Sequence, residues 1–286
     1  MMGSGPNLGI CFSDKQLYFA IEDNKTPRRL KRIGCFDFNF NVAKAIQTQQ
    51  KDYFKGVYDL IGRLREEYDF QQIRMLTIPD TECWSTLPKL VYDQPDERES
   101  YLKILMKGVN RQALEPIWYE LSNRDYKFLV IRNKMTISGY QRLTEHAPSA
   151  DFCSDFEIGE RWVNHSKAKG SFLTVSCYPG MLSISAYLLG KLRAATFIHF
   201  DDFVDISYLW MHYAKNLKWL NGIYEDILVY GVNTHQVINE LKSIWEGSAN
   251  IIKLDTLEKM QVSADETTYS FNLESAFPAI MLALES

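Results

Sequence analysis

The same order of apolar segments occurs twice along this chain of 286 residues, and this repetition limits the fold more than any other feature. In each half, three short segments with strand periodicity precede a helix, a strand, a second helix and a further strand, and a helix closes the half. Strands that alternate with helices favour a central sheet with helices on its faces, and tight turns make the first strands antiparallel. The sequence therefore predicts an α/β protein with two βββαβαβα halves and mixed sheets. The expected halves are 1–150 and 151–286, and the last helix could pack back on the first half.

The first half begins with a predicted hairpin. Leu8 to Ser13 is a short apolar strand, and Gln16 to Glu22 alternates apolar and polar side chains after a turn. The third strand ends in Phe36, Phe38 and Phe40, which a period of two places on one face of the sheet. The remaining predicted elements are a helix with an apolar stripe from Phe54 to Tyr68, a strand at Arg74 to Pro79, a helix that starts near Pro95, a strand at Lys127 to Arg132 and a helix from Ile137 to Leu143.

The second half repeats this order after a linker from Pro148 to Lys169, in which a short helix is expected around Ile158 to His165. A helix is predicted from Asp202 to about Leu220, with Asp201 or Asp202 as its N-cap. The other predicted elements are strands at Phe172 to Cys177, Met181 to Tyr187, Leu192 to Phe200, Ile227 to Tyr230 and Ile251 to Leu254, and helices from Val237 to Trp245 and Glu274 to Leu284. Tyr178-Pro179-Gly180 supplies the turn of the second hairpin.

Three stretches at the ends of predicted strands combine glycine with small or polar side chains. The first reads Gly9-Ile10-Cys11-Phe12-Ser13, the second Thr174-Val175-Ser176-Cys177-Tyr178-Pro179-Gly180, and the third Tyr230-Gly231-Val232-Asn233. No Asp or Glu stands in any of them.

The duplicated order and these three stretches resemble the superfold of actin, sugar kinases and heat-shock ATPases, which is built of two ribonuclease H-like halves. Within that superfold, the chain looks most similar to the bacterial branch of the pilus assembly protein PilM and the cytoplasmic domain of the secretion protein GspL. It also resembles an uncharacterised bacterial family known only as a domain of unknown function. The resemblance covers nearly the whole chain and rests mainly on the order of elements.

The resemblance implies that the first two stretches are phosphate loops and that the third is an adenosine motif which retains only Gly231 of a glycine pair. It thus implies a degenerate nucleotide site at Gly9, Cys11, Ser13, Ser176, Gly180 and Gly231. In active members an aspartate stands where this chain has Cys11, a glycine stands where it has Ser13, and the second loop carries an acid. A thiol or hydroxyl cannot replace a carboxylate as a ligand of Mg²⁺, the ion that phosphoryl transfer needs. The expectation is therefore a protein without catalytic residues, metal or cofactor. The alternative is a nucleotide-binding ATPase or switch that binds ATP with Mg²⁺ through acids from elsewhere, such as Asp14, Asp201 or Asp202.

Other chemical constellations are sparse. His199, Asp201, Asp202 and Asp205 form the nearest approach to an acid or metal cluster, but capping of a helix explains the acids. The remaining histidines have no partners at ligand spacing and are expected at the surface or half-buried: His146, His165, His212 and His235. HExxH, GxSxG, GxGxxG and GxxxxGK[ST] are absent from the sequence.

Charge and cysteine usage limit the partners. With 36 acidic and 32 basic residues the net charge is −4, which argues against a field that gathers nucleic acid, and the pairs Arg28-Arg29 and Lys31-Arg32 are interpreted as a solvated strand end. Five scattered cysteines predict reduced thiols. The stretch Met1 to Pro6 lacks the features of a secretory signal, and the apolar segment Ala276 to Leu284 is too short to cross a bilayer. We expect a cytoplasmic protein with no membrane insertion and no nucleic-acid partner.

A protein partner is the remaining expectation. Trp84, Trp118, Trp162 and Trp219 lie at predicted element ends or in loops, where rings often anchor partners, although core packing is the more common role for any one of them. The segment Thr81 to Asp93 is long for a connection between strand and helix, and it lies where the superfold often carries inserted material. The sequence thus predicts an interaction or assembly module, with the partner and the oligomeric state left open.

Overall fold

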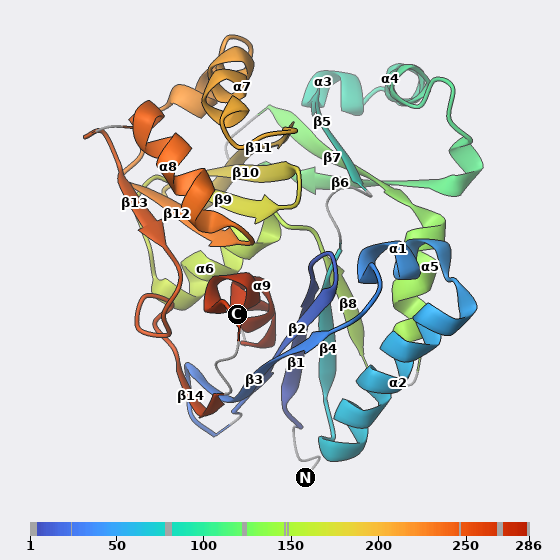
Figure 1. The fold of residues 1–286 in the computed structure, drawn as a ribbon. Coiled ribbons are helices and arrows are strands. Elements are labelled where there is room, and N and C mark those ends of the chain that lie inside the picture. Colours follow the sequence, from blue (N-terminus) through green and yellow to red (C-terminus); the bar gives the residue numbers. More distant parts are fainter. Residues whose placement is uncertain are drawn as a thin grey trace.

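The computed structural model describes residues 5–23, 25–77, 82–121, 125–145, 147, 149–245, 247–267 and 271–284. Two mixed sheets, one of six strands and one of five, form the main body, and a sheet of three strands lies at the edge of the first (Figure 1). Each large sheet begins with an antiparallel hairpin and continues with a parallel strand beside it. The predicted α/β architecture with two hairpin-led mixed sheets is confirmed.

The six-stranded sheet belongs to the first half of the chain, except for one strand from the C-terminal region. Its strands, in order across the sheet, are β14 (Ser263–Thr267), β3 (Arg29–Asp37), β2 (Gln16–Glu22), β1 (Asn7–Phe12), β4 (Gln72–Leu76) and β8 (Ala150–Cys153). The helices packed on one face are α1 (Val42–Thr48), α2 (Lys51–Glu67) and α5 (Lys134–Leu143). Leu8, Ile10 and Phe12 alternate along β1 and join the core beneath these helices.

The opposite face of this sheet is covered by α9 (Leu273–Ala283). Every residue of α9 is buried, and Figure 1 shows the helix in the middle of the molecule, between the two large sheets. Gly9 allows the close approach, because a Cβ at this position would lie 2.0 Å from the carbonyl oxygen of Ala279. The prediction that the last helix packs back on the first half is therefore what the contacts of α9 with β1, β2 and β4 show.

The five-stranded sheet belongs to the second half. Its order is β11 (Lys191–His199), β10 (Met181–Leu188), β9 (Phe172–Tyr178), β12 (Asp226–Gly231) and β13 (Asn250–Lys253). α7 (Asp205–Ala214) and α8 (Thr234–Trp245) share a core with one face of this sheet, to which Leu173, Val175 and Cys177 of β9 contribute. α6 (Glu157–Ser166), which the sequence predicts in the linker, packs against α9 on the other side.

The three-stranded sheet corrects the predicted order of the first half. It consists of β5 (Glu82–Pro88), β7 (Tyr126–Asn133) and β6 (Leu114–Glu120), with the helices α3 (Lys89–Tyr92) and α4 (Pro95–Leu105) in the connection between β5 and β6. Lys127 to Arg132 was expected as the last strand of the large sheet, but it is the central strand of this small one. The large sheet ends instead at β8, inside the predicted linker. We refer to β5, α3, α4, β6 and β7 as the inserted module.

Two helix predictions also need correction. α7 begins at Asp205, and its N-cap position is Val204 with no side-chain hydrogen bond, so neither Asp201 nor Asp202 caps it. The helix ends at Ala214, and a separate 3₁₀ turn follows at Lys218–Asn221.

Four residues named in the sequence analysis lie outside the described residues: Pro79, Thr81, His146 and Pro148. Within the residues that the structure describes, no helix has both the length and the apolarity that crossing a bilayer demands.

Candidate functional site

The predicted loop positions meet where the two hairpins face each other. Cys11 and Ser13 come from the end of β1, Ser176 from β9 and Gly231 from the end of β12, and all line one small cavity together with residues of α9. We call this place the hairpin junction. Gly9 lies beneath α9 and Gly180 lies in the β9–β10 turn with a φ of 70°, so neither lines the cavity.

The cavity at the hairpin junction has a volume of about 20 Å³. This is room for a single water, whereas pockets for small ligands usually measure roughly 300 to 1,000 Å³. Ser275 of α9 occupies the space between the two hairpins: its hydroxyl donates to the carbonyl oxygen of Gly231 at 2.9 Å, and its own carbonyl accepts from Cys11 Sγ at 3.5 Å. In this arrangement, α9 fills most of the space between the two hairpins.

The lining of this cavity carries no charged side chain among the described residues. Burial raises the pKa of the Cys11 thiol well above its ordinary value, and burial does the same for Cys177. Both sulfurs are therefore neutral thiols, which are poor ligands for a hard cation such as Mg²⁺. The alternative acids Asp14, Asp201 and Asp202 do not line the cavity either. Asp14 accepts a hydrogen bond from the side chain of Asn41.

One acid that the sequence reasoning missed lies behind the hairpin junction. Asp155, between β8 and α6, is 1% exposed, and its Oδ1 accepts a hydrogen bond of 2.7 Å from the hydroxyl of Tyr178, which lines the cavity. Burial raises the pKa of Asp155 to about 6, although the hydroxyls of Ser183, Tyr178 and Ser176 act in the opposite direction. The only signal in the sequence is the position of Asp155 just after the short apolar strand β8, and that strand was itself interpreted as linker.

Hydroxyl groups surround this carboxylate on the five-stranded sheet. Ser176 faces Ser183 across β9 and β10, and Thr174 faces Ser185 in the next pair on the same face. All four side chains are buried. Asp155 Oδ2 and the hydroxyls of Thr174, Ser183, Ser185 and Tyr230 make no direct hydrogen bond. A buried carboxylate among such hydroxyls can take up a proton near neutral pH and can order water, because buried polar groups favour partners of this kind.

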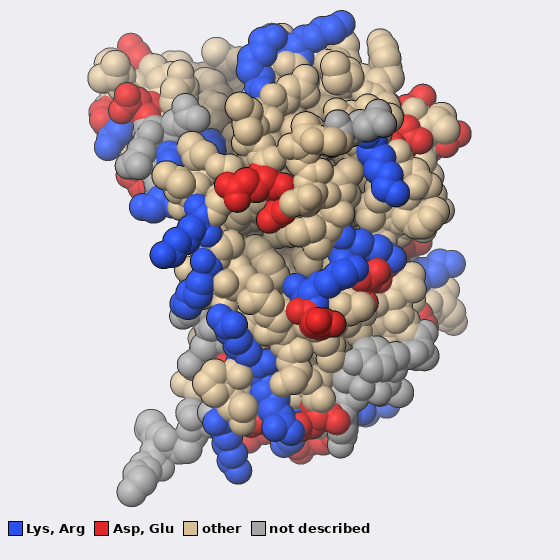
Figure 2. All heavy atoms as spheres, turned by 90° about the vertical axis from the view of Figure 1, so that its left-hand side faces the viewer, with Lys and Arg blue, Asp and Glu red and all other residues tan. Residues whose placement is uncertain are grey.

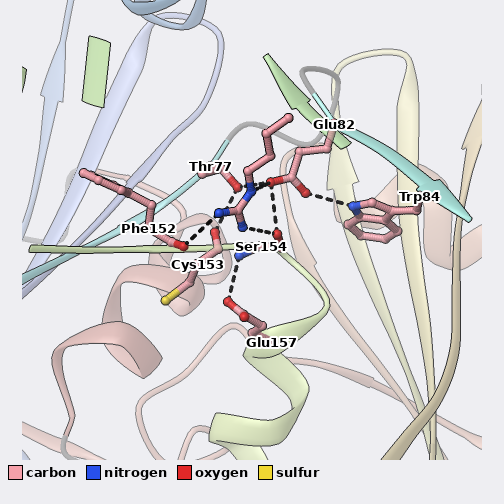
Figure 3. Close-up of polar contacts among 8 residues, drawn as sticks. Thr77, Glu82, Trp84, Phe152, Cys153, Ser154 and Glu157 are labelled. Carbon is pink, nitrogen blue, oxygen red and sulfur yellow. Dashed lines mark hydrogen bonds and ion pairs between the residues drawn. The ribbon is translucent and has the colours of Figure 1, made fainter. Parts of the chain in front are cut away.

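A second buried network joins the inserted module to the six-stranded sheet (Figure 3). Arg132 Nε of β7 donates to Glu82 Oε1 of β5 at 2.8 Å, and the two side chains are 7% and 0% exposed. Arg132 also donates to Ser154 Oγ at 2.5 Å, next to β8. The hydroxyl of Thr77 donates to Glu82 at 2.6 Å and the indole of Trp84 donates to it at 2.8 Å. Figure 3 shows Thr77, Glu82, Ser154 and Trp84 converging on one point.

The charges of this network are fully compensated. Burial alone would lower the pKa of Arg132, but the negative charge of Glu82 raises it above its ordinary value. Burial raises the pKa of Glu157, whose carboxylate accepts from the backbone nitrogen of Ser154 at 2.9 Å. Since each of these polar groups has partners within the protein, the arrangement is a structural joint between sheets and offers no open ligand position.

The tryptophans expected as partner anchors divide into different roles. Trp84 packs against Phe197 of β11, with ring centroids 3.8 Å apart and the rings tilted by 36°, and so connects the inserted module with the second half. Trp162 is buried against Phe277 of α9. Trp118 and Trp219 are half-buried, the first beside Tyr92 in the inserted module and the second against the core of the second half.

The histidine and acid constellations do not assemble into a site. Among the described residues, no group of three or more His, Cys, Asp and Glu side chains could hold a metal ion. His199, Asp201 and Asp202 are exposed, and His212 and His235 are exposed on helices. His165 differs from the expectation of an exposed or half-buried ring, because it is buried and its Nε2 lies 3.0 Å from the carbonyl oxygen of Met260. Burial lowers the pKa of this imidazole.

A larger hollow of about 820 Å³ lies outside the hairpin junction, near the end of α6 and the starts of β9 and β12. Its lining combines the bases Lys169 and Lys259 with the acids Glu225, Asp226 and Glu258. Because this lining carries charges of both signs, with one acid more than bases, the hollow has no electrostatic preference for phosphate groups.

Comparison with known proteins identifies the fold. No protein-family model and no curated protein sequence matches the chain. Among solved structures, PilM in the PilM–PilN type IV pilus biogenesis complex is similar with a TM-score of 0.64 and 10% identity, over 97% of this chain and 96% of that chain. A Bacteroides thetaiotaomicron protein with an actin-like ATPase fold and unknown function has a TM-score of 0.54 and 13% identity, over 86% and 90% of the two chains.

The third similar structure is the cytoplasmic domain of EpsL, an inner-membrane component of the type II secretion system of Vibrio cholerae. It has a TM-score of 0.52 and 6% identity, over 96% of this chain and 92% of that chain. The chain therefore has the actin-like ATPase fold along nearly its whole length. The predicted relation to PilM and GspL is confirmed for the fold.

Proposed function

We propose that this protein is an interaction or assembly module of the bacterial cytoplasm that has the actin-like ATPase fold and does not turn over ATP. The observation that carries the proposal is the filled hairpin junction, where α9 leaves a cavity of about 20 Å³ with an uncharged lining. PilM, which shares the fold, was solved in a complex with PilN, and this supports a role in protein assembly. The five cysteines are free thiols, in keeping with a reducing compartment.

Chemistry at the hairpin junction supports the absence of turnover. Transfer of a phosphoryl group depends on a metal ion that neutralises the phosphates and on a polar group that positions the attacking water. Cys11 and Cys177 are buried neutral thiols, and the nearest hydroxyls, Ser176 and Ser275, carry no charge. These groups cannot hold Mg²⁺ comparably to a pair of carboxylates.

The anchoring of α9 also supports a permanently filled junction. Glu274 at the start of the helix accepts from Thr234 at 3.1 Å and forms an ion pair of 2.9 Å with Lys253, so the helix is tied to the second half. α9 is buried between the two halves: it packs against β12 and α6 on one side and against β1, β2 and β4 on the other, with Gly9 in direct contact. To admit a nucleotide, the protein would have to expose this apolar helix, and that costs hydrophobic free energy.

The inserted module is the proposed partner surface. Its helices α3 and α4 and the segment just after α4 carry large apolar side chains in solvent: Leu90 on α3 is 79% exposed, Ile104 on α4 73% and Val109 after α4 54%. The predicted partner segment Thr81 to Asp93 corresponds, in its described part, to β5, α3 and the residue after them. Exposed apolar side chains that gather on one element are typical of interaction sites.

Thermal melting with Mg·ATP tests the proposal. A ligand at about 100 times its Kd raises the free energy of unfolding by roughly 2.7 kcal/mol, whereas we expect no shift beyond that of Mg²⁺ with a non-nucleotide phosphate. A large shift that is specific for ATP would overturn the view of a filled junction.

A photo-crosslinker at Ile104, compared with one at the exposed Tyr53 on α2, tests the partner surface. We expect a discrete adduct from position 104 alone.

A second candidate function is a nucleotide-dependent switch, and Asp155 is the observation that favours it. This acid lies behind the junction, bonded to Tyr178 of the cavity lining, so a displacement of α9 would place it near an incoming phosphate. Steady release of phosphate from Mg·ATP by the parent protein, lost in a folded Asp155→Asn variant, would support the switch. Absence of turnover in the parent removes it.

A further inference from the structure

The turn between β10 and β11 has an unusual residue for its backbone conformation. Leu188 pairs with Lys191, so the turn consists of Leu189 and Gly190 alone, and their φ angles are 53° and 73°. A two-residue turn with two positive φ angles favours Asn-Gly or Asp-Gly, because a bulky side chain is disfavoured in the left-handed region. Leucine at position 189 therefore opposes the local backbone preference.

Packing does not compensate this choice. Leu189 is 70% exposed and the neighbouring Leu188 is 42% exposed, so the two leucines form an apolar tip in solvent. A residue that is unfavourable for the turn and also unfavourable for solvation has no benefit for the stability of the fold. Such local conflicts are expected at functional positions.

Basic side chains surround this tip. A Cβ on Gly190 would lie 2.9 Å from Val163 Cγ1 and 3.3 Å from the carbonyl oxygen of Ala168, so the turn rests on the end of α6, where Lys167 and Lys169 are exposed. Lys191 is exposed within the hairpin itself.

Arg28 completes this rim. It is exposed as a residue and donates to the carbonyl oxygen of His165 at 2.6 Å, at the same end of α6. Figure 2, which views the side of the molecule that carries α6 and β14 in Figure 1, shows Lys and Arg side chains in a band down one margin of this face. The neighbouring acids are Glu160 on α6, Glu225, whose carboxylate lies against Gly170, and Asp226 and Glu258, which line the same hollow as Lys169. The exposed bases next to the turn and the end of α6 are Arg28, Lys167, Lys169 and Lys191.

We propose that the Leu188–Leu189 tip and its basic rim, Arg28, Lys167, Lys169 and Lys191, form a peripheral attachment site for an anionic lipid bilayer. The leucines enter the headgroup region and the bases contact the headgroups, which combines the two contributions that hold peripheral proteins on membranes. The negative charge of the distant parts of the chain matters little, because salt screens it beyond about 10 Å. A nucleic acid would use the bases but would leave the leucines unexplained. The inference is independent of the proposed function.

Vesicle co-sedimentation tests the site. The parent protein should sediment with vesicles of phosphatidylcholine and phosphatidylglycerol and remain in solution with phosphatidylcholine alone. Leu189→Asn supplies the residue that the turn prefers, so it should fold at least as well as the parent and lower the affinity by about tenfold. Each of Lys167→Gln and Lys169→Gln should lower the affinity by about fivefold at low salt, since a base near an anionic surface contributes about 1 kcal/mol.

Matched controls separate this site from general stickiness. Val204→Asn removes an apolar side chain that is 67% exposed beyond the opposite end of β11, and Lys215→Gln with Lys218→Gln removes exposed bases near the end of α7. Neither control should change vesicle binding. The proposal is wrong if the parent fails to sediment with anionic vesicles, if it binds both vesicle types equally, or if Leu189→Asn binds as the parent does. Displacement from vesicles by an oligonucleotide, with equal oligonucleotide affinity in the Leu189→Asn variant, would assign the bases to nucleic acid instead.

Discussion

The two halves share a hairpin and a parallel fourth strand, but the inner faces of their hairpins differ. In the first half, the inner face of β1 presents Gly9 and Cys11 to the apolar helix α9. In the second half, the corresponding face of β9 and β10 carries buried hydroxyl side chains, which include Ser176 and Ser183, beside Asp155. The same backbone architecture therefore provides an apolar contact on one side of the junction and a titratable one on the other.

The halves also differ in the connection after the fourth strand. In the second half, β12 leads directly into α8, whereas in the first half the inserted module lies between β4 and α5. The second half shows that this architecture needs no such module, so the module must be held by contacts of its own. The Glu82–Arg132 pair supplies the polar part of that attachment (Figure 3).

The largest expected effect comes from the joint of the inserted module. Arg132→Met leaves the carboxylate of Glu82 buried without its cation, and removal of one partner of a buried pair costs about 3 to 5 kcal/mol. Urea unfolding measures this loss. Arg111→Met is the matched control, because its pair with Glu99 is 37% and 48% exposed, and exposed ion pairs contribute little to stability. Equal costs for the two variants would show that the Glu82–Arg132 pair does not hold the module.

The second effect concerns Asp155 and depends on pH. Its pKa is raised from 3.8 to about 6 in the folded state, so the folded protein binds the proton more tightly than the unfolded chain does. The free energy of unfolding should therefore fall as the pH rises between about 4 and about 6, by up to about 3 kcal/mol. Asp155→Asn lacks this ionisation and still offers an oxygen to Tyr178.

Urea unfolding of the parent and of Asp155→Asn at pH 4.5 and 7.5, read as a difference between the two proteins, isolates this group from the other acids. We expect the variant to gain stability relative to the parent at the higher pH. A difference that is independent of pH would mean that Asp155 is not buried among the hydroxyls as described, and the contrast between the two inner faces would then disappear.

The third effect tests the apolar side of the junction. Gly9→Ala places a Cβ at 2.0 Å from the carbonyl oxygen of Ala279, so α9 must shift, and overpacking of this kind costs about 1 to 3 kcal/mol. Gly62→Ala is the control, because it lies inside α2 with no atom within 4 Å and should stabilise the helix by up to about 1 kcal/mol. Thermal melting distinguishes the opposite signs. Tolerance of Gly9→Ala would show that α9 is loosely held, and would reopen the junction to ligands.

The sequence predicts the structural elements that local patterns determine. Both hairpins follow from alternation of apolar side chains around short turns, and the stripe from Phe54 to Tyr68 identifies α2. The strand Lys127 to Arg132 was also recognised, but its sheet was not, because an apolar run shows that a strand is buried without showing which strands lie beside it.

The sequence predicts less of the candidate site than of the fold. The loop stretches were located, and Cys11, Ser13, Ser176 and Gly231 do meet at one cavity. Its small size depends on α9, which comes from the far end of the chain, so no local pattern could indicate it. Asp155 looks like an ordinary polar residue of a linker until β8 and α6 bury it under β9 and β10. The expected cap at Asp201 or Asp202 was wrong because α7 starts further along the chain.

The smallest effect compares how helices begin in the two halves. In the first half, the side chain of Asn133 accepts from the backbone nitrogen of Met135 and so caps α5, whereas α7 of the second half has Val204 at its N-cap position and no side-chain cap. Asn133→Ala should therefore cost about 1 kcal/mol in thermal or urea unfolding, and Val204→Ala, at a residue that is 67% exposed, should change stability by less than about 0.5 kcal/mol. Because α5 comes directly after β7, loss of its cap weakens the return of the chain from the inserted module to the large sheet. An equal response of the two variants would mean that packing of α5 against α1, and not its cap, fixes this return.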